Sequence, residues 1–222
     1  MAKTIAVIPA RGGSKRLPKK NILDLNGKPL IAHSILYALA QKEIDDVYVS
    51  TNDPAIKTVA LTFGAKVIDR PEAISGDHEP TITSVQHVLE RLDFDVDQVV
   101  LLQATNPLRP KSLFTNAFKH FLEQQTDCLF TVTRNHDKLG HIQNNRFIPF
   151  NYTPGQRSQD LKPLFFENGL LYITKASAIK KGFIISETGF PFEVSHPFAS
   201  VDIDTAEDFE YANFVLKTYH HE

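Results

Sequence analysis

Short apolar runs along the chain alternate with longer segments whose apolar residues follow helical periodicity. The short runs predict buried strands and the periodic segments predict amphipathic helices. This alternation is typical of βαβ units, so we expect an α/β fold with a mostly parallel sheet and helices on both faces. The predicted strands are Lys3–Ala10, Asp46–Ser50, Lys66–Ile68, Gln98–Gln103, Asp127–Thr133, Gly169–Thr174 and a short one near Phe198–Val201. The predicted helices are Pro29–Gln41, Pro54–Phe63, Thr81–Leu92, Leu113–Gln124 and one that begins at Thr205.

The alternation stops over Arg134–Pro163, where His, Asn, Gln, Pro and Gly occur with little sustained periodicity. A long irregular stretch inside a compact domain usually serves a function, forms an interface or is mobile. The chain has 222 residues, of which 42% are hydrophobic, and this is enough for one sizeable core. We therefore expect a single domain over residues 1–222, with residues 134–165 as an excursion from it.

Charge and composition exclude several classes of protein. The formal net charge is −2 and the sequence pI is about 6.5, whereas a general nucleic-acid binder is usually basic over a whole face. No apolar run approaches the roughly 20 residues of a membrane span, and the N-terminus lacks a signal-peptide layout. We therefore expect no nucleic acid and no membrane as partners, and a soluble, cytoplasmic protein. The single cysteine, Cys128, excludes an internal disulfide and a cysteine-based zinc site.

Residues 6–21, AVIPARGGSKRLPKKN, place a cation-rich loop directly after the first predicted strand. Ligands of open α/β sheets bind where strands end, and glycines let backbone N–H groups approach an anion closely. The loop is neither a Walker A sequence nor G-x-G-x-x-G, yet it has what a triphosphate requires. The alternative is an ordinary solvated basic loop. Its cations are Arg11, Lys15, Arg16, Lys19 and Lys20.

A second candidate site is the segment DIDT, residues 202–205. Asp202 and Asp204 are two positions apart, so in an extended segment both carboxylates point to the same side. Mg²⁺ suits such a pair, because it takes few protein carboxylates and completes its shell with water and phosphate oxygens. The alternative is that Asp204 only caps the following helix, for which it is well placed, and that Asp202 is a surface charge.

Six stretches together carry a resemblance that extends over essentially the whole chain. The sequence resembles the CMP-sugar synthetases, that is, the acylneuraminate and related nonulosonate cytidylyltransferases. The resemblance implies a Rossmann-like nucleotidyltransferase fold whose excursion serves dimerisation and sugar binding. It also implies a homodimer that uses CTP, Mg²⁺ and a 2-keto sugar acid, and that releases pyrophosphate when the anomeric hydroxyl attacks the α-phosphorus. The stretches are residues 6–31, STND at 50–53, DRPEAISGD at 69–77, LLQATNPLR at 101–109, QRSQDL with ENGLLYI at 156–173, and DIDTAEDF at 202–209.

The resemblance also assigns roles to individual positions. Arg11, Ser14 and Lys15 are expected to hold the β- and γ-phosphates, while Lys20 lies against the α-phosphate. Lys20, Arg11 and Asp204 form the expected catalytic set, and Asp202 and Asp204 are the expected metal ligands. Asn21, Arg70, Asp77 and Thr81 are expected to contact the nucleotide, and Gln103, Arg157, Gln159 and Asn168 the sugar.

The sequence leaves two alternative hypotheses about function open. The acceptor could be 3-deoxy-octulosonate, a sugar phosphate, or a legionaminate- or pseudaminate-type sugar, because one sequence does not reveal the shape of the sugar pocket. The chain could also be a nucleotide-binding module without turnover. Lys20, Asp202 and Asp204 argue against such a module, because binding alone does not require all three. Ala104 and Asn106 depart from the QPTSPLR pattern of the family and leave the geometry of that loop open.

Overall fold

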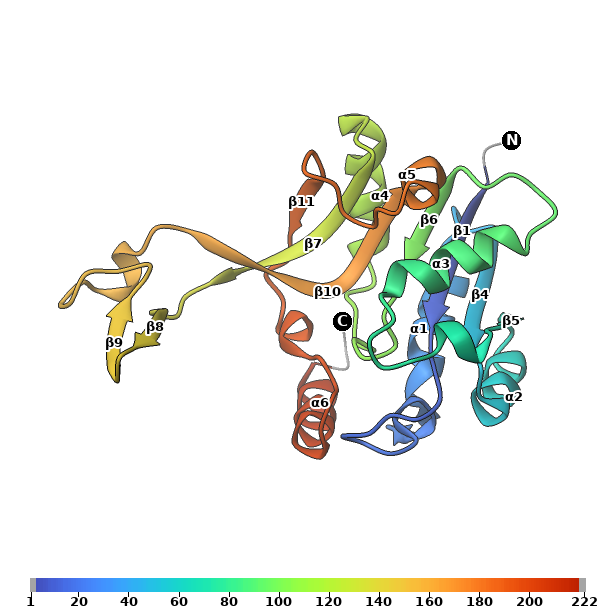
Figure 1. The fold of residues 1–222 in the computed structure, drawn as a ribbon, viewed down its shortest axis with the longest axis horizontal. Coiled ribbons are helices and arrows are strands. Elements are labelled where there is room, and N and C mark those ends of the chain that lie inside the picture. Colours follow the sequence, from blue (N-terminus) through green and yellow to red (C-terminus); the bar gives the residue numbers. More distant parts are fainter. Residues whose placement is uncertain (1–2, 220–222) are drawn as a thin grey trace.

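A seven-stranded sheet forms the centre of the computed structural model, which describes residues 3–219. Its strand order is β11-β7-β10-β6-β1-β4-β5 (Figure 1). Strands β6, β1, β4 and β5 run parallel to one another, and β10 is antiparallel to both of its neighbours. The strands of the sheet are β1 Thr4–Pro9, β4 Asp46–Thr51, β5 Lys66–Asp69, β6 Gln98–Leu101, β7 Cys128–Asn135, β10 Leu164–Lys175 and β11 Phe190–Glu193.

Helices cover both faces of this sheet, as the sequence predicts. Apolar side chains of α1, α2 and α4 pack on one face, and those of α3 and α5 pack on the other. The helix α6 packs separately against the β2–β3 region and the segment around Val201. The helices are α1 Leu30–Leu39, α2 Pro54–Thr62, α3 Thr81–Glu90, α4 Leu113–Gln124, α5 Ala176–Lys180 and α6 Ala206–Thr218.

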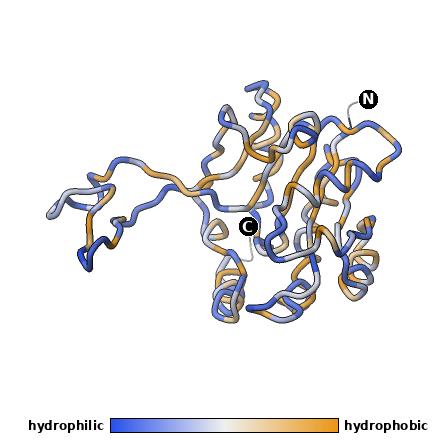
Figure 2. The backbone as a smooth tube through the Cα atoms, in the orientation of Figure 1, coloured by the Kyte–Doolittle hydropathy of each residue, from blue (hydrophilic) through white to orange (hydrophobic). Residues whose placement is uncertain are grey.

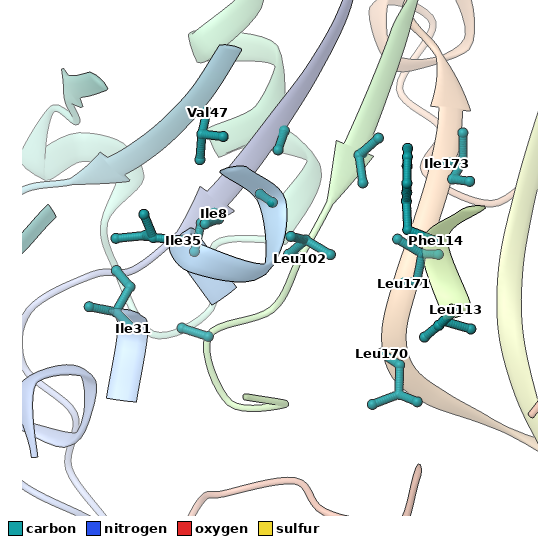
Figure 3. Close-up of a cluster of buried hydrophobic side chains, with 14 of the residues drawn as sticks. Ile8, Ile31, Ile35, Val47, Leu102, Leu113, Phe114, Leu170, Leu171 and Ile173 are labelled. Atoms are coloured by element: carbon teal, nitrogen blue, oxygen red, sulfur yellow. The ribbon is translucent and has the colours of Figure 1, made fainter. Parts of the chain in front are cut away.

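Strand β1 lies at the centre of the sheet, and its burial explains why its sequence is almost entirely apolar. Ile5 and Val7 face the core on the side of α3, whereas Ala6 and Ile8 face the side of α1. A parallel strand that is covered on both faces needs apolar residues at every position rather than at alternate ones. Figure 3 shows the larger core, in which Ile8 meets side chains from α1 and β4, with Leu102 beyond them.

Residues 136–163 form an arm that projects from the body of the molecule (Figure 1). The outer ends of β7 and β10 pair with each other to form its base, and a hairpin of β8 Gly140–Gln143 and β9 Arg146–Pro149 lies near its tip. The arm also contains a 3₁₀ turn, Ser158–Asp160. Figure 2 shows hydrophobic stretches within this arm, although no core surrounds it. Its exposed apolar side chains are Leu139, Ile142, Phe147, Ile148 and Phe150.

Two parts of the sequence prediction differ from the structure. The prediction of a strand near Phe198–Val201 is wrong, because Pro197–Ser200 is a 3₁₀ turn. Proline at its first position presets the helical φ angle, and Nδ1 of His196 accepts a hydrogen bond from Phe198 N–H. Several short elements were not predicted, since they are too short to show periodicity. They are β2 Asp24–Leu25, β3 Lys28–Pro29, β11, α5, the β8–β9 hairpin and the 3₁₀ turns Lys20–Ile22 and Glu72–Ile74.

Candidate active site

The loops that follow β1, β5 and β6 meet at one edge of the sheet, where these parallel strands end. They surround a cavity of about 510 Å³. The segment after Val201 contributes the remaining wall, because Ile203 N–H donates a hydrogen bond to the carbonyl of Thr105 at 2.8 Å. The cavity is lined by Pro9, Ala10, Arg11, Ser14, Lys15, Arg16, Leu17, Lys20, Asn21, Asp77, Thr81, Gln103, Ala104, Thr105 and Asp204.

Arg11 and Lys15 pair with a carboxylate from across the cavity. Nη2 of Arg11 lies 2.9 Å from Oδ1 of Asp77, and Nζ of Lys15 contacts the other oxygen of the same carboxylate. Hydrogen bonding by Lys15 and the charges of Lys15 and Arg11 hold the pKa of Asp77 below its ordinary value. Two of the loop cations are therefore held by one anionic group, which indicates that this side of the cavity is suited to an anion.

Lys20 and Arg16 share a second carboxylate. Nζ of Lys20 donates to Oδ1 of Asp204 at 2.8 Å and to the carbonyl of Ile203 at 2.7 Å, and Nη2 of Arg16 lies 2.5 Å from Oδ2 of Asp204. Lys20 is only 8% exposed, whereas Arg16 is exposed. The preceding residue, Lys19, is exposed and has a left-handed backbone with φ +56°, which turns the chain so that Lys20 enters the protein.

The DIDT segment places its two carboxylates beside the loop of residues 102–106. Asp204 lines the cavity, and the pKa of Asp202 is raised by burial and by the nearby charge of Asp204, while hydrogen bonding by Thr105 opposes this shift. The prediction that Asp204 caps the last helix is wrong. Thr205 is the N-cap, because its hydroxyl accepts from Asp208 N–H and the Asp208 carboxylate accepts from Thr205 N–H. Asp204 therefore remains available to the cavity.

Arg70 lies at the end of β5 and is buried, with its Nε and Nη2 atoms unpaired among the described residues. Burial and, to a lesser extent, the neighbouring charge of Arg11 lower its pKa. Asn21 is also buried and donates to the carbonyl of Arg11 at 3.1 Å, so it fixes the start of the cationic loop. Thr81 lines the cavity as the first residue of α3. Asn21 and Thr81 line the cavity together with Asp77, whereas Arg70 does not.

Gln103 and Asn168, both predicted to contact the sugar, occupy different environments. Gln103 lines the cavity, and its Nε2 lies 3.5 Å from the Tyr172 hydroxyl. Asn168 is buried, and its side chain is hydrogen-bonded to Thr131, to Thr133 and to the N–H of Leu170. Asn168 therefore shapes the irregular part of β10, while a direct contact with sugar stays a prediction.

The structure places Arg157 and Gln159 on the arm, outside the cavity of their own chain. Nε and Nη2 of Arg157 pair with the carboxylate of Asp160 at 2.8 and 3.1 Å. Both residues are exposed. Within one chain, then, the arm residues predicted to bind the sugar do not join the other site residues.

Three buried or partly buried polar residues near the site were not predicted from the sequence. Asn106 stands where the family pattern has serine, and it donates to the carbonyls of Val201 and Asn168. It therefore links its own loop to the segments that contain these two residues. Arg109 is buried and donates to the carbonyls of Gln103 and Leu170 and to Ser34 Oγ. Asn52 contacts the loop after β1. The motifs LLQATNPLR and STND contain all three residues, but motif membership does not reveal which atoms meet.

The fold and this site define an α/β protein of the nucleotidyltransferase kind, with cations and carboxylates around a cavity at the ends of parallel strands. A family model described as cytidylyltransferase matches residues 5–218. The chain belongs to the cytidylyltransferase family.

Curated relatives agree with this assignment. A pseudaminic acid cytidylyltransferase of Campylobacter jejuni is 35% identical over 98% of each chain. An N-acylneuraminate cytidylyltransferase of Streptococcus agalactiae is 32% identical over 93% of this chain and 52% of its own length. An N-acylneuraminate cytidylyltransferase A of Danio rerio is 36% identical over 93% of this chain and 49% of its own.

Solved structures share the fold at lower identity. A CMP:2-keto-3-deoxy-manno-octonic acid synthetase complexed with CTP superposes with a TM-score of 0.73 at 21% identity, covering 98% of this chain and 99% of that one. A 4-diphosphocytidyl-2C-methyl-D-erythritol synthase from Anaerococcus prevotii has a TM-score of 0.68 at 16% identity, covering 97% and 96%. No helix in residues 3–219 is both long and apolar enough to cross a membrane.

Proposed function

We propose that this chain transfers the cytidylyl group of CTP to the anomeric hydroxyl of a nonulosonate sugar acid. The hydroxyl oxygen forms a bond to the α-phosphorus and loses its proton, while the bond from the α-phosphorus to the bridging oxygen breaks and pyrophosphate leaves. The observation that carries the proposal is one cavity in which Arg11 and Lys15 lie beside Asp77 and in which Arg16 and Lys20 lie beside Asp204. The relatives named for pseudaminic acid and N-acylneuraminate support the class of acceptor.

In this proposal, the loop after β1 binds the triphosphate. Arg11, Ser14 and Lys15 hold the β- and γ-phosphates, on which negative charge accumulates as pyrophosphate leaves. Fixed cations at that position stabilise the transition state more than the ground state. Lys20 acts at the α-phosphate, because its buried ammonium is already oriented by Ile203 and Asp204. The phosphate oxygens take over Arg11 and Lys15 from Asp77, which holds both cations when no anion is present.

Asp202 and Asp204 are the residues that would hold Mg²⁺. The pair fits a hard divalent cation, because burial and, to a lesser extent, the charge of Asp204 raise the pKa of Asp202, and a cation would offset both effects. The described residues contain no cluster of three or more metal-binding side chains, so the remaining ligands would be phosphate oxygens and water. When bound, the ion would neutralise phosphate charge and favour ionisation of the sugar hydroxyl.

The nucleoside and the sugar occupy opposite ends of the cavity in this proposal. Arg70 reads the cytidine, since its guanidinium is buried with two unpaired nitrogen atoms and would gain an acceptor there. Asn21 and Thr81 contact the same nucleotide. Gln103, at the end of β6, contacts the sugar.

We further propose that two chains form a homodimer through the arm. The arm exposes apolar side chains that include Ile142 at 78% and Phe150 at 71%, and a second chain would cover them. Arg157 and Gln159 would then reach the sugar in the partner's cavity, where the guanidinium would bind the sugar carboxylate through two hydrogen bonds. We also propose that the enzyme is cytoplasmic.

The reaction is tested by measuring pyrophosphate release with CTP and Mg²⁺ over a panel of free sugar acids. Pseudaminate comes first, followed by N-acetylneuraminate, legionaminate and 3-deoxy-octulosonate, with UTP and ATP as nucleotide controls. Release with CTP and one nonulosonate supports the proposal and names the substrate. Release with 3-deoxy-octulosonate alone would replace the acceptor, and CTP binding without release over the whole panel would favour a binding module.

A further inference from the structure

The STND motif at residues 50–53 has no role in the site described above, yet its asparagine joins two loops of that site. Oδ1 of Asn52 accepts a hydrogen bond from the backbone N–H of Gly12 at 2.9 Å. Nδ2 of the same side chain donates to Oε1 of Glu72, also at 2.9 Å. One amide group therefore connects the loop after β1, which carries the cations, with the segment after β5, which carries Asp77.

The side chain of Asp53, the residue that follows Asn52, leaves little space beside Gly12. A Cβ atom added to Gly12 would lie 2.9 Å from Oδ2 of Asp53, so only glycine fits there without a shift. Asp53 is itself fixed, since its carboxylate caps α2 by accepting from the N–H groups of Ala55 and Ile56. The end of β4 thus presents a rigid surface to Gly12, and Asn52 holds Gly12 against that surface.

Arg11, the neighbour of Gly12, faces the same segment after β5. Its Nη1 lies 3.5 Å from the carbonyl of Ser75, and its Nη2 pairs with Asp77. Arg11 and Asp77 line the cavity of about 510 Å³, whereas Asn52 lines only an adjoining cavity of about 410 Å³ that shares these two residues. For a ligand in the cavity of about 510 Å³, the influence of Asn52 therefore passes through its hydrogen bonds to Gly12 and Glu72.

We propose that Asn52 is a positioning residue that fastens the phosphate loop, residues 11–15, to the segment 72–77, so that both are preformed for CTP. An ordered loop binds more tightly because the ordering cost is met before the ligand arrives. Without Asn52, the N–H of Gly12 and the carboxylate of Glu72 would lose their shared partner, and the two loops would move independently. This inference rests on the proposed use of CTP and adds to it the residue that organises the site.

The first test substitutes Asn52→Ala and uses Asn116→Ala, at an exposed asparagine on α4, as the matched control. We expect the Kd for CTP to rise roughly tenfold or more, the effect of losing one to two net hydrogen bonds. The KM for the sugar acid should change less than twofold. A merely structural role would lower thermal stability without separating the two substrates in this way.

The second test reverses the polarity of the Asn52–Glu72 hydrogen bond. In Asn52→Asp, a carboxylate still accepts from Gly12 N–H, but it faces the Glu72 carboxylate, so we expect weaker CTP binding than in Asn52→Ala. Adding Glu72→Gln restores a donor opposite the new carboxylate and keeps the net charge of the natural protein. We expect the double variant to recover most of the CTP affinity.

A third measurement does not depend on CTP at all. Amide hydrogen exchange over residues 11–14 of the ligand-free protein should accelerate at least tenfold in Asn52→Ala, because the Gly12 amide loses its acceptor. Unchanged exchange, unchanged CTP affinity, or a double variant as weak as Asn52→Asp would overturn the inference. If the natural protein bound no CTP while Asn52→Ala still accelerated exchange, the proposed function would fail and the positioning role of Asn52 would stand.

Discussion

Replacing Lys20 by methionine tests the centre of the proposed mechanism. Lys20 is 8% exposed, and its ammonium donates to the carbonyl of Ile203 and to Asp204. Methionine preserves most of the volume of the aliphatic stem but removes both hydrogen bonds and the positive charge. The change therefore separates the ammonium from the packing of the side chain.

Two magnitudes are expected for this change. Loss of a buried hydrogen bond to a charged partner costs roughly 2 kcal/mol of stability, which in a domain of this size lowers the melting temperature by about 4–8 °C. Loss of one preorganised donor at the reacting phosphate costs about 3–4 kcal/mol of transition-state stabilisation, a fall of roughly 10²–10³-fold in turnover. Arg16 keeps its pairing with Asp204, so the fold should survive.

The assay is steady-state pyrophosphate release at saturating CTP and sugar acid, with the melting temperature measured on the same samples. Lys19→Met is the matched control, because Lys19 is the adjacent lysine and is exposed. We expect the control to retain turnover within about twofold, in keeping with an exposed surface position. CTP should still bind to Lys20→Met, with weakened affinity. Turnover within tenfold of the natural protein, together with a lower melting temperature, would show that Lys20 is only structural.

Three further predictions concern the metal pair, the base and the arm. Asp202→Asn should abolish Mg²⁺-dependent turnover yet raise the melting temperature in metal-free buffer at neutral pH. The reason is that folding raises the pKa of Asp202, so the ionised carboxylate destabilises the folded state. The gain in melting temperature should vanish as the pH falls below about 4, where the natural carboxyl is protonated in both states. Equal metal-free melting temperatures at pH 7 would contradict this. Arg70→Met should raise the Kd for CTP at least tenfold without lowering the melting temperature, since it removes a buried guanidinium that has two unpaired nitrogen atoms. Calorimetric titration and a thermal melt decide this. Phe150→Glu should turn a dimer into a monomer in light scattering and raise the KM for sugar, whereas a monomeric natural protein would refute the dimer.

Much of the fold follows from local patterns in the sequence. The run TIAVIP forms a central strand because helices cover both faces of the sheet and bury its apolar side chains. The helix α4 has the predicted bounds, Leu113–Gln124. Elements of two to five residues, such as β2, β3 and α5, show no periodicity, so their existence depends on tertiary partners. The turn at Pro197–Ser200 contains apolar residues that could equally form a strand, and only its contacts decide between the two.

The candidate site likewise depends partly on local sequence and partly on tertiary contacts. The sequence by itself determined which residue types are present for chemistry: a cation-rich glycine loop after the first strand and two aspartates two positions apart. Only the tertiary structure decided their partners, because it placed Asp77 opposite Arg11, turned Lys20 inward to Asp204, and made Thr205 the helix cap. The physical reason is that local sequence sets backbone preferences over a few residues, whereas ion pairs between residues as far apart as Lys20 and Asp204 form only when the sheet brings strand ends together.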